Sequence, residues 1–378
     1  MLLISVVIAT FNRAAELRKT LSSLNGLHCT DGWELIVVDN NSTDDSARLA
    51  RQSGARVIQE PEPGYGSALR AGFRAASGDF IVMADADATY PIEALRELVE
   101  PVAHGDVDIM VGARLDAATS ASMPFTHRYI GTPALTTLVR LASGGNDLSD
   151  SQSGFRAFRK STVEDLGLSS TGMELASEML VRANQHGLRM AEVPLGYRAR
   201  LGASKLNTWR DGMRHLRLIL RLGPHVALWY PGLVVLGLSL GLLFGSLFAP
   251  NGLVVGEILW QPVFAASILA VVGVCAATVG AALAAIGSGT SPLVREQFRW
   301  VAAPVTARRV RRIASIVITA GVLTDFALFI RWVAGRPPLD VQLQIAALAQ
   351  VLIIVGAILM MVAALHRLLS TRGDGATL

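Results

Sequence analysis

Cysteine is scarce in this chain, whose 378 residues include only Cys29 and Cys275. Because the two residues are far apart and lie in segments of different composition, the sequence implies neither a disulfide framework nor a thiolate metal site. A reducing compartment such as the cytoplasm is consistent with this pattern. The fold must therefore rest on packing, and any metal site on other ligands.

Two further features are missing. The apolar segment 1–10 has no basic region before it and no small-residue cleavage site after it, so it is predicted to be a first strand and not a signal peptide. The chain also lacks a basic stripe interleaved with aromatic residues, which argues against nucleic-acid binding. The net charge of +4 and the pI near 9.4 instead come with arginines around apolar runs, which is typical of contact with anionic lipid headgroups.

Apolar residues are abundant and unevenly distributed. They make up 51% of the chain, and the mean hydropathy of +0.43 is too high for a purely soluble protein. We predict an α/β domain over residues 1–205, an amphipathic juxtamembrane helix over 206–224, and an all-α transmembrane domain over 225–378. The expected strands cover residues 4–9, 33–38, 57–59, 80–84, 107–113 and 190–197, and the expected helices 14–24, 68–76 and 172–181. Their alternation predicts a mostly parallel, Rossmann-like doubly wound sheet.

The strand expected at 80–84 ends in two carboxylates, Asp85 and Asp87. In open α/β sheets, ligands bind in the crevice beyond the carboxyl ends of the strands. Two acids at that place, with no basic residue beside them in sequence, suit a hard divalent cation held between protein oxygens and a diphosphate. An Asp-x-Asp in a surface loop is the alternative, but the preceding buried strand favours the cation site.

Asp39 ends the strand expected at 33–38 and should share the same sheet edge. A carboxylate there can accept hydrogen bonds from a base N–H or a ribose hydroxyl, although a helix-entry residue is an equally ordinary interpretation. Gly64 and Gly66 lie in a loop rich in glycine and proline. They would let the backbone approach a phosphate, or they simply form a turn.

Four segments in order resemble successive motifs of the family 2 glycosyltransferases. More closely, they resemble the polyprenyl-phosphate glycosyltransferases, relatives of the dolichyl-phosphate mannosyl- and glucosyltransferases. The segments are Ser5-Val-Val-Ile-Ala-Thr-Phe-Asn12, Ile36-Val-Val-Asp-Asn-Asn-Ser-Thr-Asp44, Gly64-Tyr-Gly-Ser-Ala-Leu-Arg-Ala-Gly72 and Met83-Ala-Asp-Ala-Asp87. The resemblance covers most of residues 4–217. It implies a GT-A fold, a nucleotide-sugar donor, a Mg²⁺ or Mn²⁺ ion, and inversion at the anomeric carbon.

The resemblance also assigns roles in donor and metal binding. The donor nucleotide should contact the turn containing Ala9, Thr10 and Asn12, as well as Asp39 and Asp85. The metal should be held by Asp85, by the catalytic Asp87, and by Thr89, which stands where the family often places a further ligand. The family usually has proline at the position of Ala9 and glutamate at that of Arg13, so this turn departs from its pattern.

A second set of residues matches the family's acceptor region. Arg114 and Arg128 stand where the family holds the lipid phosphate, and Arg128 is also assigned to catalysis. The segment 198–205 resembles the loop Arg-x-x-Gly-x-Ser-Lys, with Arg200, Ser204 and Lys205 as further phosphate ligands. The spacing departs by one residue, so either Arg198 or Arg200 takes the arginine position. Glu174 and Glu178 lie on one helical face, either solvated or pointing at the site.

The segment 206–222 carries an arginine stripe beside an apolar one. The arginines recur at intervals of four, three and four residues, which places them along one side of a helix. This pattern is typical of a helix in the membrane interface, with arginines near headgroup phosphates. The alternative is a helix that packs on the soluble domain. The arginines are Arg210, Arg214, Arg217 and Arg221, and the apolar residues Leu206, Trp209, Met213, Leu216 and Leu220.

Four apolar runs, 229–248, 263–286, 313–333 and 341–365, each reach the length of about 20 residues that a spanning helix needs. Arginines gather in the loop near 287–312 and in the tail, so the positive-inside rule places the N-terminal domain, this loop and both termini in the cytoplasm. Asp325 lies inside the third run. It is either a functional acid or a polar contact between helices.

These features together predict an integral membrane enzyme. It would transfer one sugar from a nucleotide donor of the UDP-glucose or GDP-mannose type to polyprenyl phosphate at the cytoplasmic membrane face. The acceptor phosphate is already an anion near neutral pH, so the reaction needs arginine and lysine more than a strong base. The alternatives are transfer to a hydroxyl, with Asp150 or Glu174 as base, and a non-catalytic membrane protein with a degenerate GT-A domain. The sequence leaves the oligomeric state open, a homo-oligomer included.

Overall fold

The computed structural model describes residues 3–24, 32–114, 127–145, 148–195, 198, 208–248, 251–255, 258–286, 290–337 and 339–373. The chain forms two compact units. The N-terminal unit comprises Met1–Leu222 together with Ser291–Leu293. The C-terminal unit comprises Gly223–Thr290 and Val294–Leu378.

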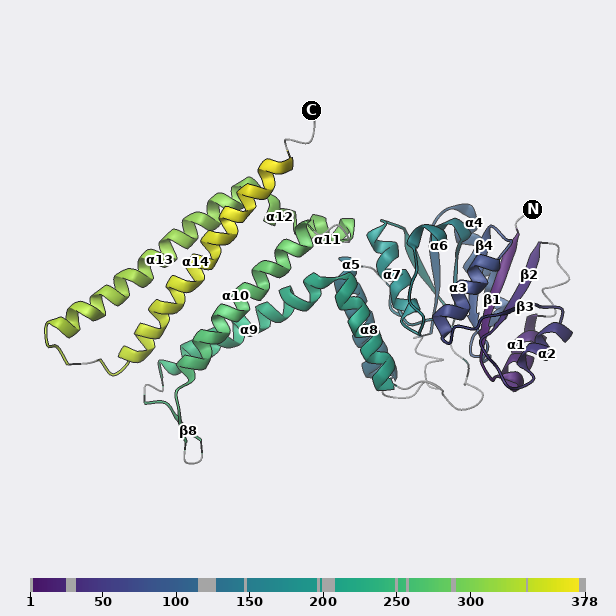
Figure 1. The fold of residues 1–378 in the computed structure, drawn as a ribbon, viewed down its shortest axis with the longest axis horizontal. Coiled ribbons are helices and arrows are strands. Elements are labelled where there is room, and N and C mark those ends of the chain that lie inside the picture. Colours follow the sequence, from purple (N-terminus) through teal and green to yellow (C-terminus); the bar gives the residue numbers. More distant parts are fainter. Residues whose placement is uncertain are drawn as a thin grey trace. The chain divides into compact units, whose positions relative to one another are not determined.

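The N-terminal unit is built on a seven-stranded sheet of order β3-β2-β1-β4-β6-β5-β7 (Figure 1). The strands pair in parallel except β6, which is antiparallel to both β4 and β5. This mostly parallel sheet confirms the predicted GT-A type of α/β domain. The strands are β1 Ile4–Thr10, β2 Trp33–Asp39, β3 Arg56–Gln59, β4 Phe80–Asp85, β5 Ile109–Ala113, β6 Arg156–Arg159 and β7 Met190–Pro194.

Aliphatic runs put β1 and β4 in the centre of the sheet, where both faces are covered. Val7, Ile8, Ile81 and Val82 have no exposed surface, as expected of strands buried between two layers of helices. Helix α3 packs on β1 and β2, and α4 packs on β4, β5 and β6. The helices of this unit are α1 Ala14–Leu24, α2 Ser46–Gln52, α3 Tyr65–Ala75, α4 Leu95–His104, α5 Thr132–Ser143, α6 Lys160–Leu166, α7 Leu175–Gln185 and α8 Thr208–Leu222, with the short turns η1 Ile92–Ala94 and η3 His127–Gly131.

The structure differs from the sequence prediction at several places in this unit, among them β6, β7 and α3. Strand β6 was not predicted, because it has only four residues and two of them are arginines. Strand β7 ends at Pro194, three residues before the predicted end, and proline has no N–H with which to continue a ladder. Helix α3 begins at Tyr65, three residues earlier than predicted, directly after Gly64.

Helix α8 belongs to the N-terminal unit and packs on α5 and α7. His215 and Ile219 on its packed side are buried, whereas Trp209 is 79% exposed. All four arginines of the predicted stripe are also exposed. The helix therefore packs on the α/β domain, as the alternative interpretation of the sequence expected. Its exposed arginines and Trp209 leave a position in the membrane interface as a prediction.

The C-terminal unit contains four helices long and apolar enough to span a membrane, among the residues described. They are α9 Pro224–Ser246, α10 Pro262–Ile286, α13 Pro304–Val333 and α14 Gln342–Gly373. The number of spans agrees with the prediction, and α13 begins nine residues earlier than predicted. The short hairpin β8 Leu253–Val255 and β9 Ile258–Trp260 and the short helices α11 Pro292–Gln297 and α12 Arg299–Ala302 were not predicted.

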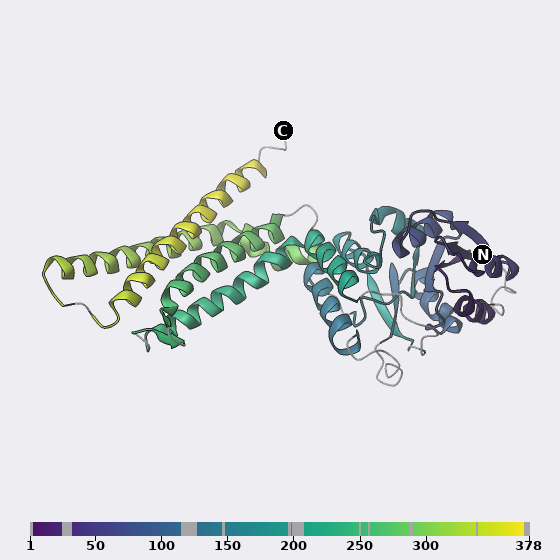
Figure 2. The same ribbon diagram turned by 60° about the horizontal axis from the view of Figure 1, so that its bottom comes forward.

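Small residues let these helices pack in two close pairs. Helices α9 and α10 lie side by side, as do α13 and α14 (Figure 2). A Cβ on Gly280 would lie 2.4 Å from the backbone nitrogen of Trp229, and one on Gly321 would lie 2.7 Å from the carbonyl oxygen of Ala349. Such contacts are typical of membrane helices, where close backbone approach provides much of the packing. Asp325 is partly buried within α13.

Candidate functional site

The carboxyl ends of β1, β2 and β4 meet at one edge of the sheet. In the parallel register Ala9 lies opposite Asp85, and Thr10 lies opposite Asp39. The prediction that the acidic strand ends share one edge is therefore confirmed. A cavity of about 520 Å³ opens at this edge, and its lining includes Ala9, Thr10, Asp85 and Asp87.

Asp85 is held from two sides. The Tyr65 hydroxyl donates a hydrogen bond of 2.6 Å to Asp85 Oδ1. Burial and the neighbouring Asp85 charge raise the pKa of Tyr65 well above its ordinary value, so the phenol keeps the proton that it donates. On the other side, Gly154 lies so close that a Cβ there would be 2.7 Å from Asp85 Oδ2. The carboxylate therefore has one defined position at the cavity wall.

This close approach yields a test of the Asp85 position. We expect Gly154→Ala to push the Asp85 carboxylate aside and to lower the sugar transfer that the sequence predicts by about 10-fold or more, because an overpacked buried site costs about 1–3 kcal/mol. Gly212→Ala on α8 is the matched control, since a Cβ there meets nothing within 4 Å. Initial rates with the best donor and acceptor measure the effect. Equal rates for the two variants would show that the site tolerates a displaced Asp85.

Asp87 follows in a tight turn. The Thr89 hydroxyl donates to Asp87 Oδ1 over 2.6 Å, and the Thr89 N–H donates over 3.3 Å. Ala88 between them has a φ of 55°, a left-handed conformation that costs a residue with a side chain of order 1–3 kcal/mol and that concentrates at functional sites. Thr89 is buried and orients Asp87, and it is not among the described residues that line the cavity.

Carboxylate oxygens are the ligands that Mg²⁺ and Mn²⁺ prefer. The described residues contain no group of three or more His, Cys, Asp or Glu side chains that could hold a metal ion. Asp85 and Asp87 can supply two carboxylates, and an ion held there would fill its remaining positions with substrate oxygens and water. This pattern is typical of cations that bind together with a phosphorylated substrate.

Hydrogen bonds connect the turn that follows β1 to the turn that follows β2. The side-chain oxygen of Asn12 accepts hydrogen bonds from the backbone of Thr43 at 2.6 Å and of Asp44 at 3.3 Å. The Asn12 N–H in turn donates to the Ser42 hydroxyl. Asp39 is 3% exposed, and its Oδ1 accepts the Ser42 N–H at 3.3 Å. Asn12 and Asp39 thus shape the turns, and neither is among the described residues that line the cavity.

Gly64 and Gly66 allow close approach to another part of the chain. A Cβ on Gly64 would lie 2.1 Å from the carbonyl oxygen of Thr171. The backbone N–H groups of Gly66 and Ser67 both donate to this oxygen, at 2.8 and 3.1 Å. The N–H groups of Gly66 and Ser67 are therefore engaged. These contacts favour the turn interpretation of the two glycines, and Gly64 also lines the cavity.

Glu178 holds the loop that contacts these glycines. It is fully buried, and its carboxylate accepts the backbone N–H groups of Ser169 and Ser170 and pairs with Arg182 at 2.8 Å. Burial would raise its pKa, but these hydrogen bonds outweigh burial and lower it. Glu174 lies beside the cavity residue Gly172, and its Oε2 is buried without a hydrogen-bond partner among the described residues. Glu174 therefore lies next to a residue that lines the cavity but is not itself among the described lining residues.

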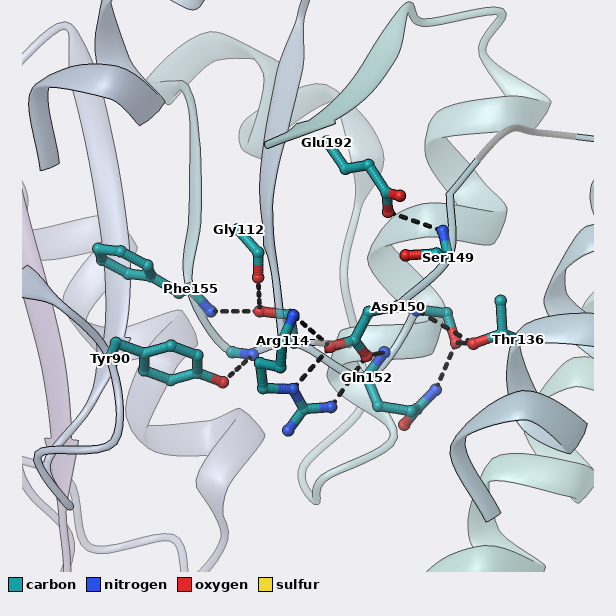
Figure 3. Close-up of polar contacts among 12 residues, drawn as sticks. Tyr90, Gly112, Arg114, Thr136, Ser149, Asp150, Gln152, Phe155 and Glu192 are labelled. Atoms are coloured by element: carbon teal, nitrogen blue, oxygen red, sulfur yellow. Dashed lines mark hydrogen bonds and ion pairs between the residues drawn. The ribbon is translucent and has the colours of Figure 1, made fainter. Parts of the chain in front are cut away.

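Arg114 and Asp150 form a buried ion pair at the end of β5 (Figure 3). Arg114 Nε lies 2.7 Å from Asp150 Oδ2 and Nη2 lies 2.9 Å from Oδ1, while the backbone N–H groups of Arg114 and Gln152 also donate to this carboxylate. Asp150 has no exposed surface. Burial alone would raise the pKa of Asp150, but Arg114 and the hydrogen bonds outweigh it and hold the pKa below its ordinary value. A carboxylate held in this way is a poor general base.

The segment from Asp150 to Arg156 is also tied to the surrounding helices. Gln152 donates to the hydroxyls of Ser151 and Ser177, and Ser151 lies 3.0 Å from Thr136 on α5 (Figure 3). Arg156 is fully buried and donates to the carbonyl oxygens of Ser151, Ser153 and Ala176. Burial lowers the pKa of Arg156 to about 10, which leaves it charged at neutral pH. This segment is therefore a rigid part of the cavity surroundings.

Residues 5–167 match the family model described as glycosyl transferase family 2. A dolichyl-phosphate hexose transferase of Haloferax volcanii is 32% identical over 210 residues, which cover 55% of this chain and 89% of that protein. The chain belongs to glycosyltransferase family 2.

Two longer relatives match over a smaller share of their own length. The low-salt glycan biosynthesis hexosyltransferase Agl6 of Haloferax volcanii is 35% identical over 67% of this chain and 61% of its own. A dolichol-phosphate mannosyltransferase of Pyrococcus furiosus is 30% identical over 58% of this chain and 64% of its own. The chain thus spans less than two thirds of these two relatives. The solved glucosyl-3-phosphoglycerate synthase of Mycobacterium tuberculosis is 24% identical over 58% of this chain and 79% of its own, with a TM-score of 0.48.

The structure describes only some of the residues that the sequence predicts to bind the acceptor phosphate of this glycosyltransferase. Arg114 is described and pairs with Asp150. Arg200, Ser204, Lys205 and the side chain of Arg128 lie outside the described residues. Arg198, the alternative to Arg200, forms an exposed ion pair with Glu93 at 3.1 Å.

Several residues that line the cavity of this glycosyltransferase were not predicted as site residues. Asn40 and Asn41 follow β2, Tyr65 is the first residue of α3, and Met173 precedes α7. Arg210, Asp211 and Arg214 come from α8. The sequence analysis assigned the two arginines to the predicted lipid-facing stripe, and the structure shows that they also line the cavity that contains the paired acids.

Proposed function

We propose that this glycosyltransferase transfers a single sugar, with inversion, from a nucleotide-diphosphate sugar to polyprenyl phosphate at the cytoplasmic membrane face. The donor would be of the UDP-glucose or GDP-mannose type. The observation that carries the proposal is the pair Asp85 and Asp87 at the carboxyl edge of a family 2 sheet, lining a cavity that also contains arginines. Relatives named dolichyl-phosphate hexose transferase and dolichol-phosphate mannosyltransferase support a lipid phosphate as acceptor.

In this proposal Asp85 and Asp87 hold a Mg²⁺ or Mn²⁺ ion, and Thr89 acts by orienting Asp87. The ion would neutralise charge on the departing diphosphate, which is the main electrostatic requirement of the reaction. Ala9 and Thr10 line the cavity on the β1 side, where the nucleotide would bind. Asn12 and Asp39 would act on the donor through the turns that they hold together.

A phosphate oxygen of the acceptor would attack the anomeric carbon. The bond from that carbon to the diphosphate oxygen then breaks, and the nucleoside diphosphate leaves with the electron pair. Because the acceptor oxygen is already anionic, no base needs to remove a proton. Arg128, Arg200, Ser204 and Lys205 would hold the acceptor phosphate. Arg114 would contribute mainly by fixing the segment that begins at Asp150.

The four apolar helices support association with a membrane. Their flanking arginines support a cytoplasmic location for the catalytic domain and both termini under the positive-inside rule. The exposed arginines and Trp209 of α8 would lie near the headgroups, within reach of an acceptor that is anchored in the bilayer.

The test uses the purified full chain in detergent with Mn²⁺ or Mg²⁺, a panel of radiolabelled nucleotide sugars, and either polyprenyl phosphate or free polyprenol. We expect labelled lipid that is labile to mild acid, and only with the phosphorylated acceptor. An acid-stable product formed from polyprenol would favour transfer to a hydroxyl. No turnover with any donor would favour a non-catalytic GT-A domain.

Transfer to a hydroxyl remains a second candidate because of one observation. Glu174 lies near the cavity with a buried carboxylate oxygen that has no hydrogen-bond partner among the described residues. Such a carboxylate is suited to act as a base. If the proposed function is right, Glu174→Gln should change the rate with polyprenyl phosphate by less than about 10-fold, whereas loss of a general base typically costs about 100-fold or more.

A further inference from the structure

Helix α8 supplies one wall of the cavity. Arg210, Asp211 and Arg214 line it together with Asp85 and Asp87. The arginines are four residues apart, so they lie one turn apart on the same side of the helix. Asp211 reduces the net charge of this wall, but two guanidinium groups against one carboxylate leave it cationic.

The position of this wall is fixed by buried contacts. His215 is 6% exposed, and its Nδ1 lies 2.9 Å from the Ser177 hydroxyl on α7. Ile219 has no exposed surface, and Gln185 donates to the Leu222 carbonyl oxygen at 3.0 Å. Helix α8 therefore docks along its length, and docking brings the first two arginines of the stripe to the cavity.

Two other groups near this cavity could also contribute positive charge. At the start of α3, the N–H groups of Gly66 and Ser67 both donate to the Thr171 carbonyl oxygen. Arg13 also lines the cavity, but its Nη1 lies 2.8 Å from Glu16 Oε1 and both side chains are largely buried. Among the described residues, the cationic side chains that line the cavity are Arg13, Arg210 and Arg214, and the last two share one side of α8.

We propose that Arg210 and Arg214 form a phosphate-binding pair that faces Asp85 and Asp87 across the cavity. This inference rests on the proposed function and extends it to the substrate contacts of α8. A guanidinium presents a planar fork of donors that matches the oxygens of a phosphoryl group. The phosphoryl group belongs either to the donor diphosphate or to the lipid acceptor. The helix would then join the predicted lipid-facing surface, which carries Arg217 and Arg221, to the reaction site.

The experiment measures binding without turnover, so that it does not depend on the success of the transfer assay. The full chain is purified in detergent as wild type and as Arg210→Gln, Arg214→Gln and the double variant. Arg217→Gln and Arg221→Gln are matched controls, because both lie on the exposed side of the same helix and are not among the described cavity-lining residues. Calorimetry gives the Kd for UDP and for GDP with Mn²⁺, and a filter assay gives the Kd for radiolabelled polyprenyl phosphate.

We expect each cavity variant to raise the Kd for one of these ligands by about 10-fold or more, since a hydrogen bond to a charged group contributes about 1.5–3 kcal/mol. A rise for the nucleoside diphosphate assigns the pair to the donor, and a rise for the lipid phosphate alone assigns it to the acceptor. The controls should change either Kd by less than about 2-fold, as exposed charges do. Unchanged values for the double variant, or equal changes in the controls, would overturn the proposal.

Two results separate this inference from the proposed function. If the chain transfers sugar to polyprenyl phosphate and the double variant binds both ligands normally, only the phosphate-binding pair is wrong. If the variants weaken binding but no lipid phosphate accepts sugar, only the proposed acceptor is wrong. The midpoint of thermal unfolding, unchanged between the variants and wild type, shows that any loss of binding does not come from misfolding.

Discussion

Asp87→Ala is expected to lower sugar transfer by about 100-fold or more, because it removes a carboxylate from the place where the leaving diphosphate must be neutralised. Asp87 is 6% exposed and lines the cavity, and Thr89 fixes its orientation. The rate is measured with saturating acceptor and a titration of Mn²⁺. The lost activity should not return at high metal concentration if Asp87 also positions the donor.

Asp79→Ala is the matched control for this prediction. Asp79 is an exposed aspartate directly before the same strand, β4, at the opposite edge of the sheet. Its replacement should leave the rate within about 2-fold of wild type, as surface substitutions usually do. An Asp87→Ala variant that retained its activity would remove the metal from the proposed reaction.

Arg114→Ala is expected to destabilise the surroundings of Asp150 by about 3–5 kcal/mol, because it leaves a buried carboxylate without its partner. Asp150 has no exposed surface, and Arg114 provides three of its four hydrogen bonds. Native-state hydrogen exchange of the full chain in detergent measures the loss of local stability around Asp150. The Gln152 amide, which donates to Asp150, should exchange at least about 100-fold faster.

Two control variants show whether faster exchange in Arg114→Ala comes from the loss of the buried ion pair. Arg198→Ala breaks an exposed pair with Glu93 and should cost about 0–1 kcal/mol. The double variant Arg114→Gln, Asp150→Asn removes both charges and keeps polar side chains at both positions, so most of the protection should return. If Arg114→Ala left the exchange of Gln152 unchanged and affected only the KM for the lipid, Arg114 would be an acceptor ligand and not a residue that fixes this segment.

The architecture was predictable because its signals are local. Continuous aliphatic runs mark β1, β2 and β4, and long apolar runs mark the four spanning helices. The meeting of Asp39 and Asp85 at one edge followed from the parallel arrangement, since the carboxyl ends of parallel strands must share an edge. Strand β6 gave no such signal, because its burial depends on neighbours brought in from distant parts of the chain.

The partners of individual side chains were not predictable in the same way. The sequence motif for Arg114 indicates an arginine at a strand end, but not that Asp150, 36 residues away, neutralises it. The sequence is compatible with either a phosphate turn or an ordinary turn at Gly64 and Gly66, and it does not indicate that Thr171 lies against both glycines. Arg210 and Arg214 lie on a helix with a clear membrane-facing pattern, and only the docking of α8 through His215 brings them to the cavity.

One measurement tests most directly whether a lipid phosphate oxygen takes the sugar. The full chain is incubated with polyprenyl phosphate labelled with ³²P and a nucleotide sugar labelled with ³H in the sugar, and the lipid product is isolated. We predict a product that carries both labels in a ratio of one to one and releases the sugar in mild acid. A lipid product with the sugar label but without ³²P would contradict the account.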